Sequence, residues 1–184
     1  MKLKLLLEEK TIESIYHSDD EDFDALVKAD KDGEWIYKAG KFWENFDYKK
    51  GLDALIKKRS DQTIYYAGLD WKEFDYEKGL EALKNTKSYG NIYDAGKYWK
   101  KFNYIKGLDA LIKIDNSGYW IYNAGEDWKK FNYDKGLDTL KKISKRFYKQ
   151  ALKSWPKGIK ASQERSKEIK DTAKKMKPSK KLRL

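Results

Sequence analysis

The sequence predicts an all-α fold, an α-solenoid of about four to five two-helix repeats with degenerate capping units and a basic C-terminal helix or tail. Three observations lead to this prediction. One motif returns four times along the 184-residue chain. The apolar residues inside each copy recur at helical spacing. Atypical copies flank the regular ones, as is typical of the ends of repeat arrays.

The repeat is an Ile-Tyr-x-Ala-Gly segment followed by a Trp, a Phe, a Tyr and a Gly-Leu pair. Successive copies lie 28, 28 and 29 residues apart. The four segments begin at Trp35, Thr63, Asn91 and Trp120. Two helices of roughly ten residues cannot bury their apolar faces alone, whereas stacked copies bury them against one another. The repetition therefore indicates a solenoid.

The chain divides into three parts on this basis. We expect an N-terminal lead-in or cap over residues 1–22, the helical array over 23–156, and a basic C-terminal segment over 157–184. A degenerate first helix at 23–28 opens the array. The apolar residues of a degenerate second helix close it: Tyr148, Ala151, Leu152 and Trp155.

The first helix of each unit begins behind a short polar residue. These residues are Asp47, Asp75, Asn103 and Asn132. Such side chains accept hydrogen bonds from the free amides of the first turn. Behind the cap, Tyr48, Leu52 and Leu55 share one helical face. Gly51 and its copies lie on that side too, and glycine weakens an isolated helix by about 1 kcal/mol. Its recurrence predicts the close approach of a neighbouring backbone.

The second helix presents a small notch between larger apolar residues. Ile36, Ala39, Gly40 and Trp43 recur at spacings of i, i+3, i+4 and i+7, which places them on one face. Such a face is a helix-packing surface, so we expect the tryptophans in this register to lie in the core. They are Trp43, Trp71, Trp99, Trp128 and Trp155.

The unit I-Y-x-A-G-x-x-W-x-x-F-D/N-Y-x-K-G-L-D-A-L resembles the short tandem α-helical repeats of proteins from large bacteriophages and some bacteria. More distantly, it resembles HEAT and tetratricopeptide arrays. The resemblance covers about 23–155 and implies a binding scaffold encoded by a phage or mobile element. It supplies no site residues, because those phage repeat proteins share no general activity.

The net charge of +11 is unevenly distributed along the chain. Residues 141–184 hold 17 Lys or Arg against three acids, a net charge of +14, so residues 1–140 carry −3. This asymmetry is typical of an interaction tail on a folded domain. The bases are mostly lysine, which favours diffuse phosphate attraction over bidentate base reading. We expect a nucleic acid (RNA or DNA) or a nucleoprotein complex as the partner.

The predicted nucleic-acid-binding residues are the bases of this C-terminal region. They are Lys141, Lys142, Lys145, Arg146, Lys149, Lys153, Lys160, Arg165, Lys167, Lys170, Lys174, Lys175, Lys177, Lys180, Lys181 and Arg183. Ile169, Ala173 and Met176 lie at helical spacing among them, which predicts a basic amphipathic helix that forms on contact with a partner. A tail that only adds solubility is the alternative.

A lysine also recurs in the first helix of each unit. The four copies are Lys50, Lys78, Lys106 and Lys135. They are placed to follow a phosphate backbone, but an acid stands three residues later, as Asp53 does after Lys50. An i,i+3 ion pair on the same helix is the interpretation we favour.

Positions that differ between the copies are candidates for a partner-specific surface, because the fold does not determine them. The predicted protein-binding residues, all apolar or aromatic, are Trp35, Phe42, Tyr66, Leu69, Tyr98 and Trp120. Neutral drift of surface residues and ordinary packing are the alternatives.

The residue types argue against several classes of protein. The chain has no cysteine and one histidine, His17, which argues against a thiolate or histidine metal site and against a disulfide scaffold. The acids repeat with the unit instead of forming one unique pair for acid–base catalysis. No apolar run reaches the roughly 20 residues of a membrane span. We expect no enzymatic activity, no cofactor, no membrane partner and a cytoplasmic location.

These observations predict a non-enzymatic repeat protein that binds another macromolecule. Its basic segment would engage nucleic acid or a nucleoprotein complex, and a protein partner is expected as well. One specific form of this hypothesis is an inhibitor of a host nucleic-acid enzyme, such as a CRISPR nuclease. A structural component of a virion and a general protein-interaction adaptor are the alternatives.

Overall fold

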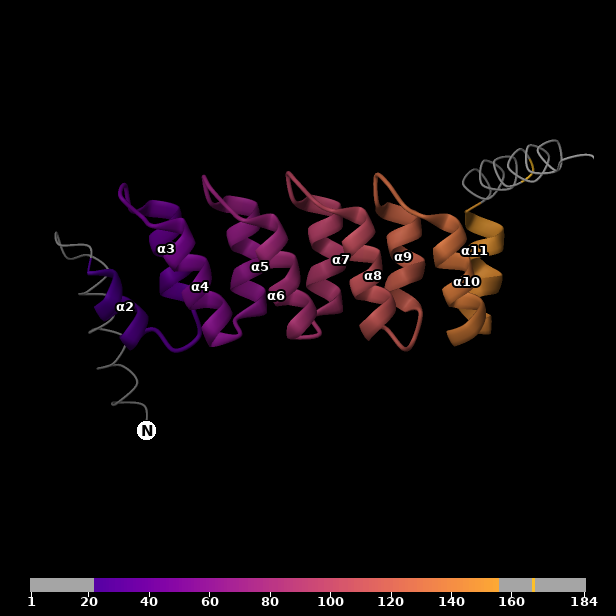
Figure 1. The fold of residues 1–184 in the computed structure, drawn as a ribbon, viewed down its shortest axis with the longest axis horizontal. Helices are drawn as coiled ribbons and strands as arrows, with labels where there is room; N and C mark the ends of the chain where they lie inside the picture. Colours follow the sequence, from indigo (N-terminus) through magenta and orange to yellow (C-terminus); the bar gives the residue numbers. More distant parts are fainter. Residues whose placement is uncertain (1–21, 156–166, 168–184) are drawn as a thin grey trace, which may run out of the picture.

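Short helices follow one another and stack into an elongated array in the computed structural model (Figure 1), which describes residues 22–155 and 167. Their bounds are α2 Phe23–Ala29, α3 Glu34–Phe42, α4 Tyr48–Lys58, α5 Asp61–Asp70, α6 Tyr76–Asn85, α7 Tyr89–Tyr98, α8 Tyr104–Ile114, α9 Tyr119–Asp127, α10 Tyr133–Ile143 and α11 Lys145–Ser154. Each unit consists of a first helix and the second helix that follows it, from α2 and α3 to α10 and α11. The predicted α-solenoid is confirmed.

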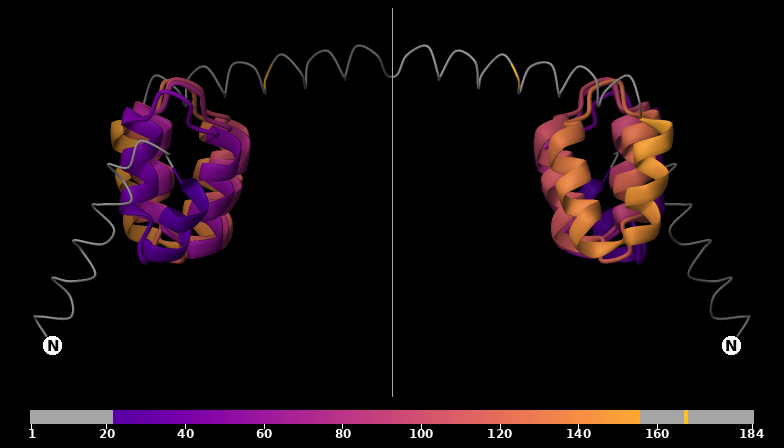
Figure 2. Two further views of the ribbon diagram at one scale, coloured as in Figure 1. Left: turned by 90° about the vertical axis from the view of Figure 1, so that its left-hand side faces the viewer. Right: turned by 90° about the vertical axis from the view of Figure 1, so that its right-hand side faces the viewer.

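The helices form two layers, seen end-on in Figure 2. Helices α4, α6, α8 and α10 make the first-helix layer, and α3, α5, α7, α9 and α11 make the second-helix layer. Each second helix contacts its partner within the unit and the equivalent helix of an adjacent unit, as α5 contacts α4 and α7. The linkers within units lie along one edge of the array, and the linkers that follow second helices lie along the opposite edge (Figure 1).

The predicted N-caps are confirmed at the start of four first helices. The side chains of Asp47, Asp75, Asn103 and Asn132 accept hydrogen bonds from the amides of Lys50, Lys78, Lys106 and Lys135 at 2.9–3.1 Å. Each cap satisfies a backbone donor that the helix itself leaves unpaired. Helix α2 is the shortened first helix expected at the start of the array, because its seven residues begin behind Asp22.

The tryptophans join one unit to the next. All five predicted core tryptophans are at least 90% buried, and each lies at the residue after its helix, in extended backbone at the first four. Trp99 packs its ring over Gly68 of the preceding second helix, and its Nε1 donates to the carbonyl of Tyr65 at 3.0 Å. Trp71 and Trp128 make the same hydrogen bond to their preceding units.

The recurring glycine of the first helix has a different neighbour from the one predicted. A Cβ at Gly51 would lie within 3.0 Å of the Phe46 ring, and the Trp71 ring lies next to that space. An aromatic side chain therefore approaches this glycine, where we predicted a backbone. The reason is that Phe46 folds back from the linker onto its own helix and meets Trp71 edge-on, with ring centroids 5.1 Å apart.

Two linkers within units contain a buried aspartate that was not predicted from the sequence. Asp30 is 1% exposed and Asp115 is 3% exposed. Asp30 accepts hydrogen bonds from the amides of Gly33 and Ile36, and burial raises the pKa of its carboxyl group. Gly118, which donates to Asp115, has a φ of +78°, the left-handed region that glycine favours. The shared pattern Asp-x-x-Gly-x-x-Ile would have revealed both linkers.

Candidate nucleic-acid interface

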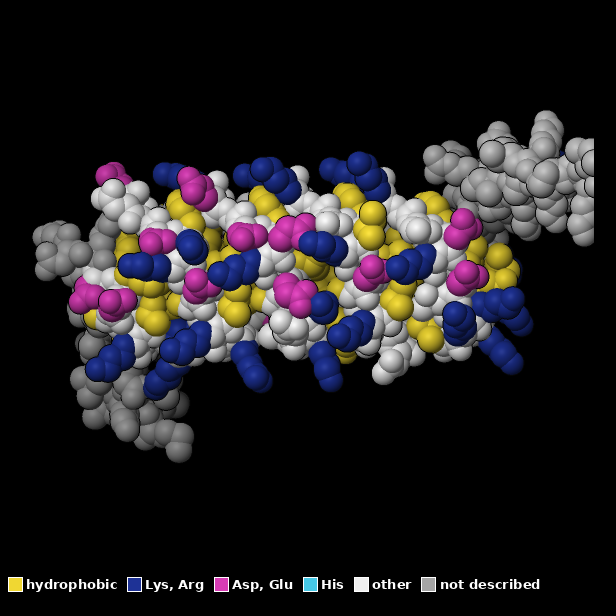
Figure 3. Space-filling model, viewed as in Figure 1, with side chains coloured by type: hydrophobic (Ala, Val, Ile, Leu, Met, Phe, Trp, Pro, Cys, Tyr) yellow, Lys and Arg dark blue, Asp and Glu magenta, His cyan; other side chains and the backbone are white. Residues whose placement is uncertain are grey.

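The recurring lysines of the first-helix layer bind acids of the preceding unit. Lys78 pairs with Asp53, Lys106 with Glu77, and Lys135 with Asp109. The prediction of i,i+3 pairs on one helix is wrong for these lysines, because their long side chains reach across to the neighbouring first helix. Dark blue and magenta side chains alternate across this face in Figure 3.

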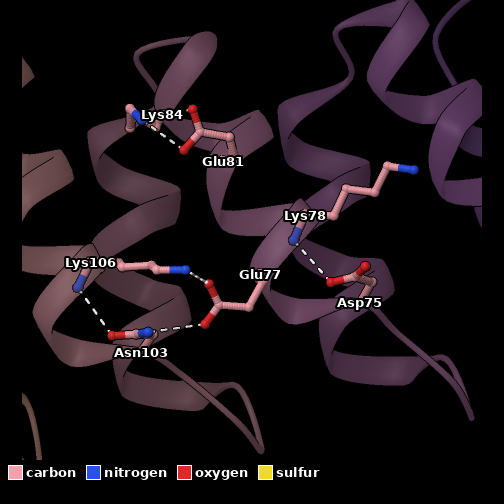
Figure 4. A network of polar contacts seen from close by, with 7 residues as sticks. All are labelled: Asp75, Glu77, Lys78, Glu81, Lys84, Asn103 and Lys106. Carbon is pink, nitrogen blue, oxygen red and sulfur yellow. Dashed lines mark hydrogen bonds and ion pairs between the residues drawn. The ribbon is translucent and has the colours of Figure 1, made fainter.

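Figure 4 shows one of these links in detail. The carboxylate of Glu77 accepts hydrogen bonds from Lys106 and from Asn103, whose amide nitrogen lies at 3.0 Å. These two donors lower the pKa of Glu77, with Lys106 having the larger effect. Lys84 pairs with Glu81 at 2.7 Å within its own helix. The charges of this face are largely compensated, so it is a structural surface.

Two of the variable positions in the second-helix layer also link neighbouring units. Tyr37 and Lys41 of α3 both contact Asp70 of α5, Tyr37 by donating its hydroxyl and Lys41 with its Nζ at 2.9 Å. The hydrogen bonds from Tyr37 and then Lys41 lower the pKa of Asp70. Lys41 and Asp70 stand at positions that vary between copies and were candidates for a partner-specific surface, but the structure uses them between units.

The same link returns two units further along. The hydroxyl of Tyr93 donates to Asp127, and Lys97 lies 3.3 Å from the same carboxylate. Burial, with a smaller contribution from the hydrogen bond to Asp127, raises the pKa of Tyr93 to about 12. At the joint between these two links, the lysine position holds Leu69 and the aspartate position holds Tyr98. The residue types at the two positions therefore change together.

The predicted protein-binding residues fall into two groups. Phe42, Tyr66 and Tyr98 are 65%, 42% and 55% exposed, as expected. Leu69, Trp35 and Trp120 are half-buried and pack against the core, so the expectation that Leu69 is exposed is wrong. The three exposed rings lie on α3, α5 and α7, and no ring contact joins them to one another. The structure does not bring the six residues together.

The basic residues at the end of the array are exposed. Lys141 and Lys142 lie in the last turn of α10, and Lys145, Arg146, Lys149 and Lys153 lie on α11. Lys145, Lys149 and Lys153 are spaced four residues apart and so form a stripe along α11. In the other second helices, the residues equivalent to Lys149 and Lys153 face the next unit. In α11 no described residue lies beyond these two lysines. We call this stripe the basic end.

Leu152 explains why the regular packing stops at this point. It stands where Gly40, Gly68, Gly96 and Gly125 form the notches for the next tryptophan. A Cβ at any of those glycines would lie within 3.0 Å of the tryptophan ring, so a leucine leaves no room for one. The Leu152 side chain is 45% exposed.

Most of the predicted binding residues beyond the array lie outside the described residues. They are Lys160, Arg165, Lys170, Lys174, Lys175, Lys177, Lys180, Lys181 and Arg183. Lys167 is described and is exposed. The division into 1–22, 23–156 and 157–184 stays a prediction at both ends.

A row of aromatic side chains near the basic end was not predicted. Ring centroids lie 5.7 Å apart from Tyr89 to Trp120, 5.0 Å from Trp120 to Tyr119, and 5.9 Å from Tyr119 to Phe147. Tyr89 is 45% exposed and Tyr119 is 47% exposed. The sequence signal is weak, because Tyr89 and Tyr119 do not recur, although Trp120 and Phe147 share one repeat position that also holds Trp35.

Comparisons with known proteins identify no relative. No family model, no curated protein and no solved structure matches this chain. The likeness to phage repeats and to HEAT or tetratricopeptide arrays therefore stays a prediction. Within residues 22–155 and 167, no helix has both the length and the apolar character needed to cross a membrane.

Proposed function

We propose that this protein binds a nucleic acid or a nucleoprotein complex through the basic end and the basic segment that follows it, and that it catalyses no reaction. The observation that supports the proposal best is the contrast between two sets of lysines. Lys78, Lys106 and Lys135 are paired with acids of a neighbouring helix. The lysines of the basic end are exposed and form no ion pair with another described residue.

The physical consequence is a local excess of positive charge. Paired lysines gain little from a phosphate, because binding it means giving up a carboxylate. Unpaired lysines release the counterions of a polyanion when they bind it, which is the main source of sequence-independent affinity. Residues 157–184 add eleven Lys or Arg against three acids, and one of these bases, Lys167, is described and exposed.

The proposal is tested with the full chain and labelled RNA and DNA of about 20 nucleotides, titrated from low to high salt. We expect affinity to fall steeply with salt. Substituting Lys145, Lys149 and Lys153 by Gln should reduce the slope of log K against log salt by about 2–3.

The matched control substitutes Lys78, Lys106 and Lys135 by Gln, which removes the same charge from the compensated face. This variant should bind almost as tightly as the parent chain, with a nearly unchanged salt slope. A salt-independent affinity, or equal losses in the two variants, would contradict the proposal.

A sharper form of the proposal is a cytoplasmic, phage-encoded inhibitor of a host nucleic-acid enzyme, such as a CRISPR nuclease. Its support is the resemblance of the repeat unit to phage repeats together with the basic end. A basic inhibitor would compete for the guide or target strand, or bind an acidic protein surface. Capture from native lysate with and without nuclease treatment separates these partners, because only a nucleic-acid-mediated complex is lost on treatment.

A further inference from the structure

We infer that the edge of the array formed by the last three linkers within units binds single-stranded nucleic acid, with nucleobases stacked on exposed tyrosines. These linkers join α6 to α7, α8 to α9, and α10 to α11, and they lie along one edge of the molecule (Figure 1). We call this surface the basic–aromatic edge. The inference rests on the proposed function and specifies the class of nucleic acid and the residues that select it.

The lysine and arginine side chains of this edge are exposed, and no acid of a described residue compensates their charge. They are Lys87, Lys113, Lys141, Lys142, Lys145 and Arg146, and none forms an ion pair with another described residue. The segments 84–90, 112–120 and 141–147 contain a single acid, Asp115. Asp115 is 3% exposed, and backbone amides occupy its carboxylate. Dark blue side chains line this edge in Figure 3.

The corresponding linkers at the other end of the array are less uniform in charge. The first carries the exposed acids Asp32 and Glu34, and the second carries Asp61 beside the bases Lys57, Lys58 and Arg59. The aromatic row lies at the last three linkers, next to the basic end, so positive charge and exposed rings coincide in this one region.

The aromatic row runs along the same edge. Tyr89 and Tyr119 are the first residues of α7 and α9, so their rings lie beside the basic linkers. The guanidinium of Arg146 lies 5.3 Å from the Phe147 ring, a cation–π contact that places a charge at the end of the row. Phe147 in turn lies 5.9 Å from Tyr119.

Exposed tyrosine rings between lysine and arginine side chains without an ion pair match the chemistry of a single strand. Unpaired nucleotides present an aromatic face to stack on a tyrosine, while their phosphates are held by lysine and arginine. A duplex keeps its bases stacked inside and offers only its phosphates to this edge. Trp120 and Phe147 are half-buried and support the two exposed tyrosines from behind, so Tyr89 and Tyr119 are the rings available for stacking.

The test uses the full chain, a labelled oligothymidylate of about 20 nucleotides, a DNA duplex of the same length and heparin. We expect Tyr119→Ala to weaken binding of the single strand about tenfold and Tyr89→Ala to have a similar effect. Duplex and heparin affinities should change less than about twofold, and the salt slope should stay the same, because no charge is lost.

Two controls keep the result interpretable. Tyr119→Phe retains the ring and should retain binding of the single strand, which assigns the effect to the ring and not to the hydroxyl. Tyr66→Ala removes a tyrosine of similar exposure, 42%, from α5, and should leave binding unchanged. Far-UV circular dichroism should match the parent chain for every variant.

The outcomes separate this inference from the proposed function. If the tyrosine variants bind the single strand like the parent chain while the basic-end variant loses affinity, the inference is overturned and the proposed function stands. Equal losses of single-strand, duplex and heparin binding in Tyr119→Ala also overturn it. A parent chain that binds none of the three probes overturns both.

Discussion

The joint between units depends on single residues whose size cannot change. A glycine of one second helix receives the tryptophan ring of the next unit, as Gly68 receives Trp99. The indole nitrogen also donates to a backbone carbonyl of that helix, so the ring can shift little. The notch therefore outweighs the cost of about 1 kcal/mol that a helical glycine carries.

We predict that Gly68→Ala lowers the free energy of unfolding by about 1–3 kcal/mol, the usual cost of overpacking a core. The new Cβ would lie within 3.0 Å of the Trp99 ring. Chemical denaturation followed by circular dichroism measures this change.

Gly90→Ala is the matched control, because it lies in the next second helix. Its nearest side-chain atom, on Trp120, would be 3.5 Å from the new Cβ. This variant should be as stable as the parent chain or more stable by about 0.5–1 kcal/mol, as alanine favours the helix. Equal effects of the two substitutions would mean that the notch does not constrain the joint.

Neighbouring second helices are linked by pairs of side chains that vary together. An ion pair joins Lys41 to Asp70 at one joint and Lys97 to Asp127 at another, and Leu69 and Tyr98 occupy the same two positions at the joint between them. At these three joints the two positions hold either opposite charges or two apolar side chains. The pairs therefore distinguish one joint from the next, whereas the buried Ile, Ala, Gly and Trp are the same in the four regular units.

We predict that a charged pair can replace Leu69 and Tyr98 with little loss of stability only when both residues are substituted. Leu69→Lys and Tyr98→Asp should each destabilise the fold, and the double variant should recover about 0.5–1 kcal/mol relative to the sum of the two. A double-mutant cycle measured by urea denaturation gives this coupling. Additive effects would show that the two positions are independent.

The whole molecule is a one-dimensional stack in which each unit contacts its neighbours. Its lysine–acid links compensate charge across the first-helix layer, and lysines without an ion pair to another described residue are exposed at the basic end and along the basic–aromatic edge. Stability in such arrays is approximately a sum over units and interfaces. The body of the array can therefore change in length while the basic region stays intact.

We predict that deleting residues 64–91, one period of the repeat, leaves a folded helical protein with a lower melting temperature. Its urea m-value should fall roughly in proportion to the surface lost. Deleting 64–95 breaks the period, because it also removes the buried Ile92 and Ala95 of α7 and leaves no second helix of full length before Trp99, and it should abolish cooperative unfolding. Thermal melts of both variants by circular dichroism provide the comparison, and similar behaviour of the two would contradict the model of stacked units.

The sequence by itself determined the helices, their caps and the buried face of each unit. These depend on local spacing: Asp47 lies directly before its helix, and Ile36, Ala39 and Gly40 lie within two turns of one another. The periodicity of the copies also required stacking, because neither helix buries its face alone. The position of the tryptophans in the core follows from the same pattern.

Only the tertiary structure decided which residues meet across a joint. Lys78 has an acid three residues away on its own helix, yet it pairs with Asp53 of the preceding unit, because the offset between helices brings that carboxylate closer. Tyr89 and Tyr119 stand at unrelated positions of the repeat, and the stacking of α7, α9 and α11 lines them up beside the basic linkers. Side-chain partners in a solenoid depend on the offset between units, which local spacing does not encode.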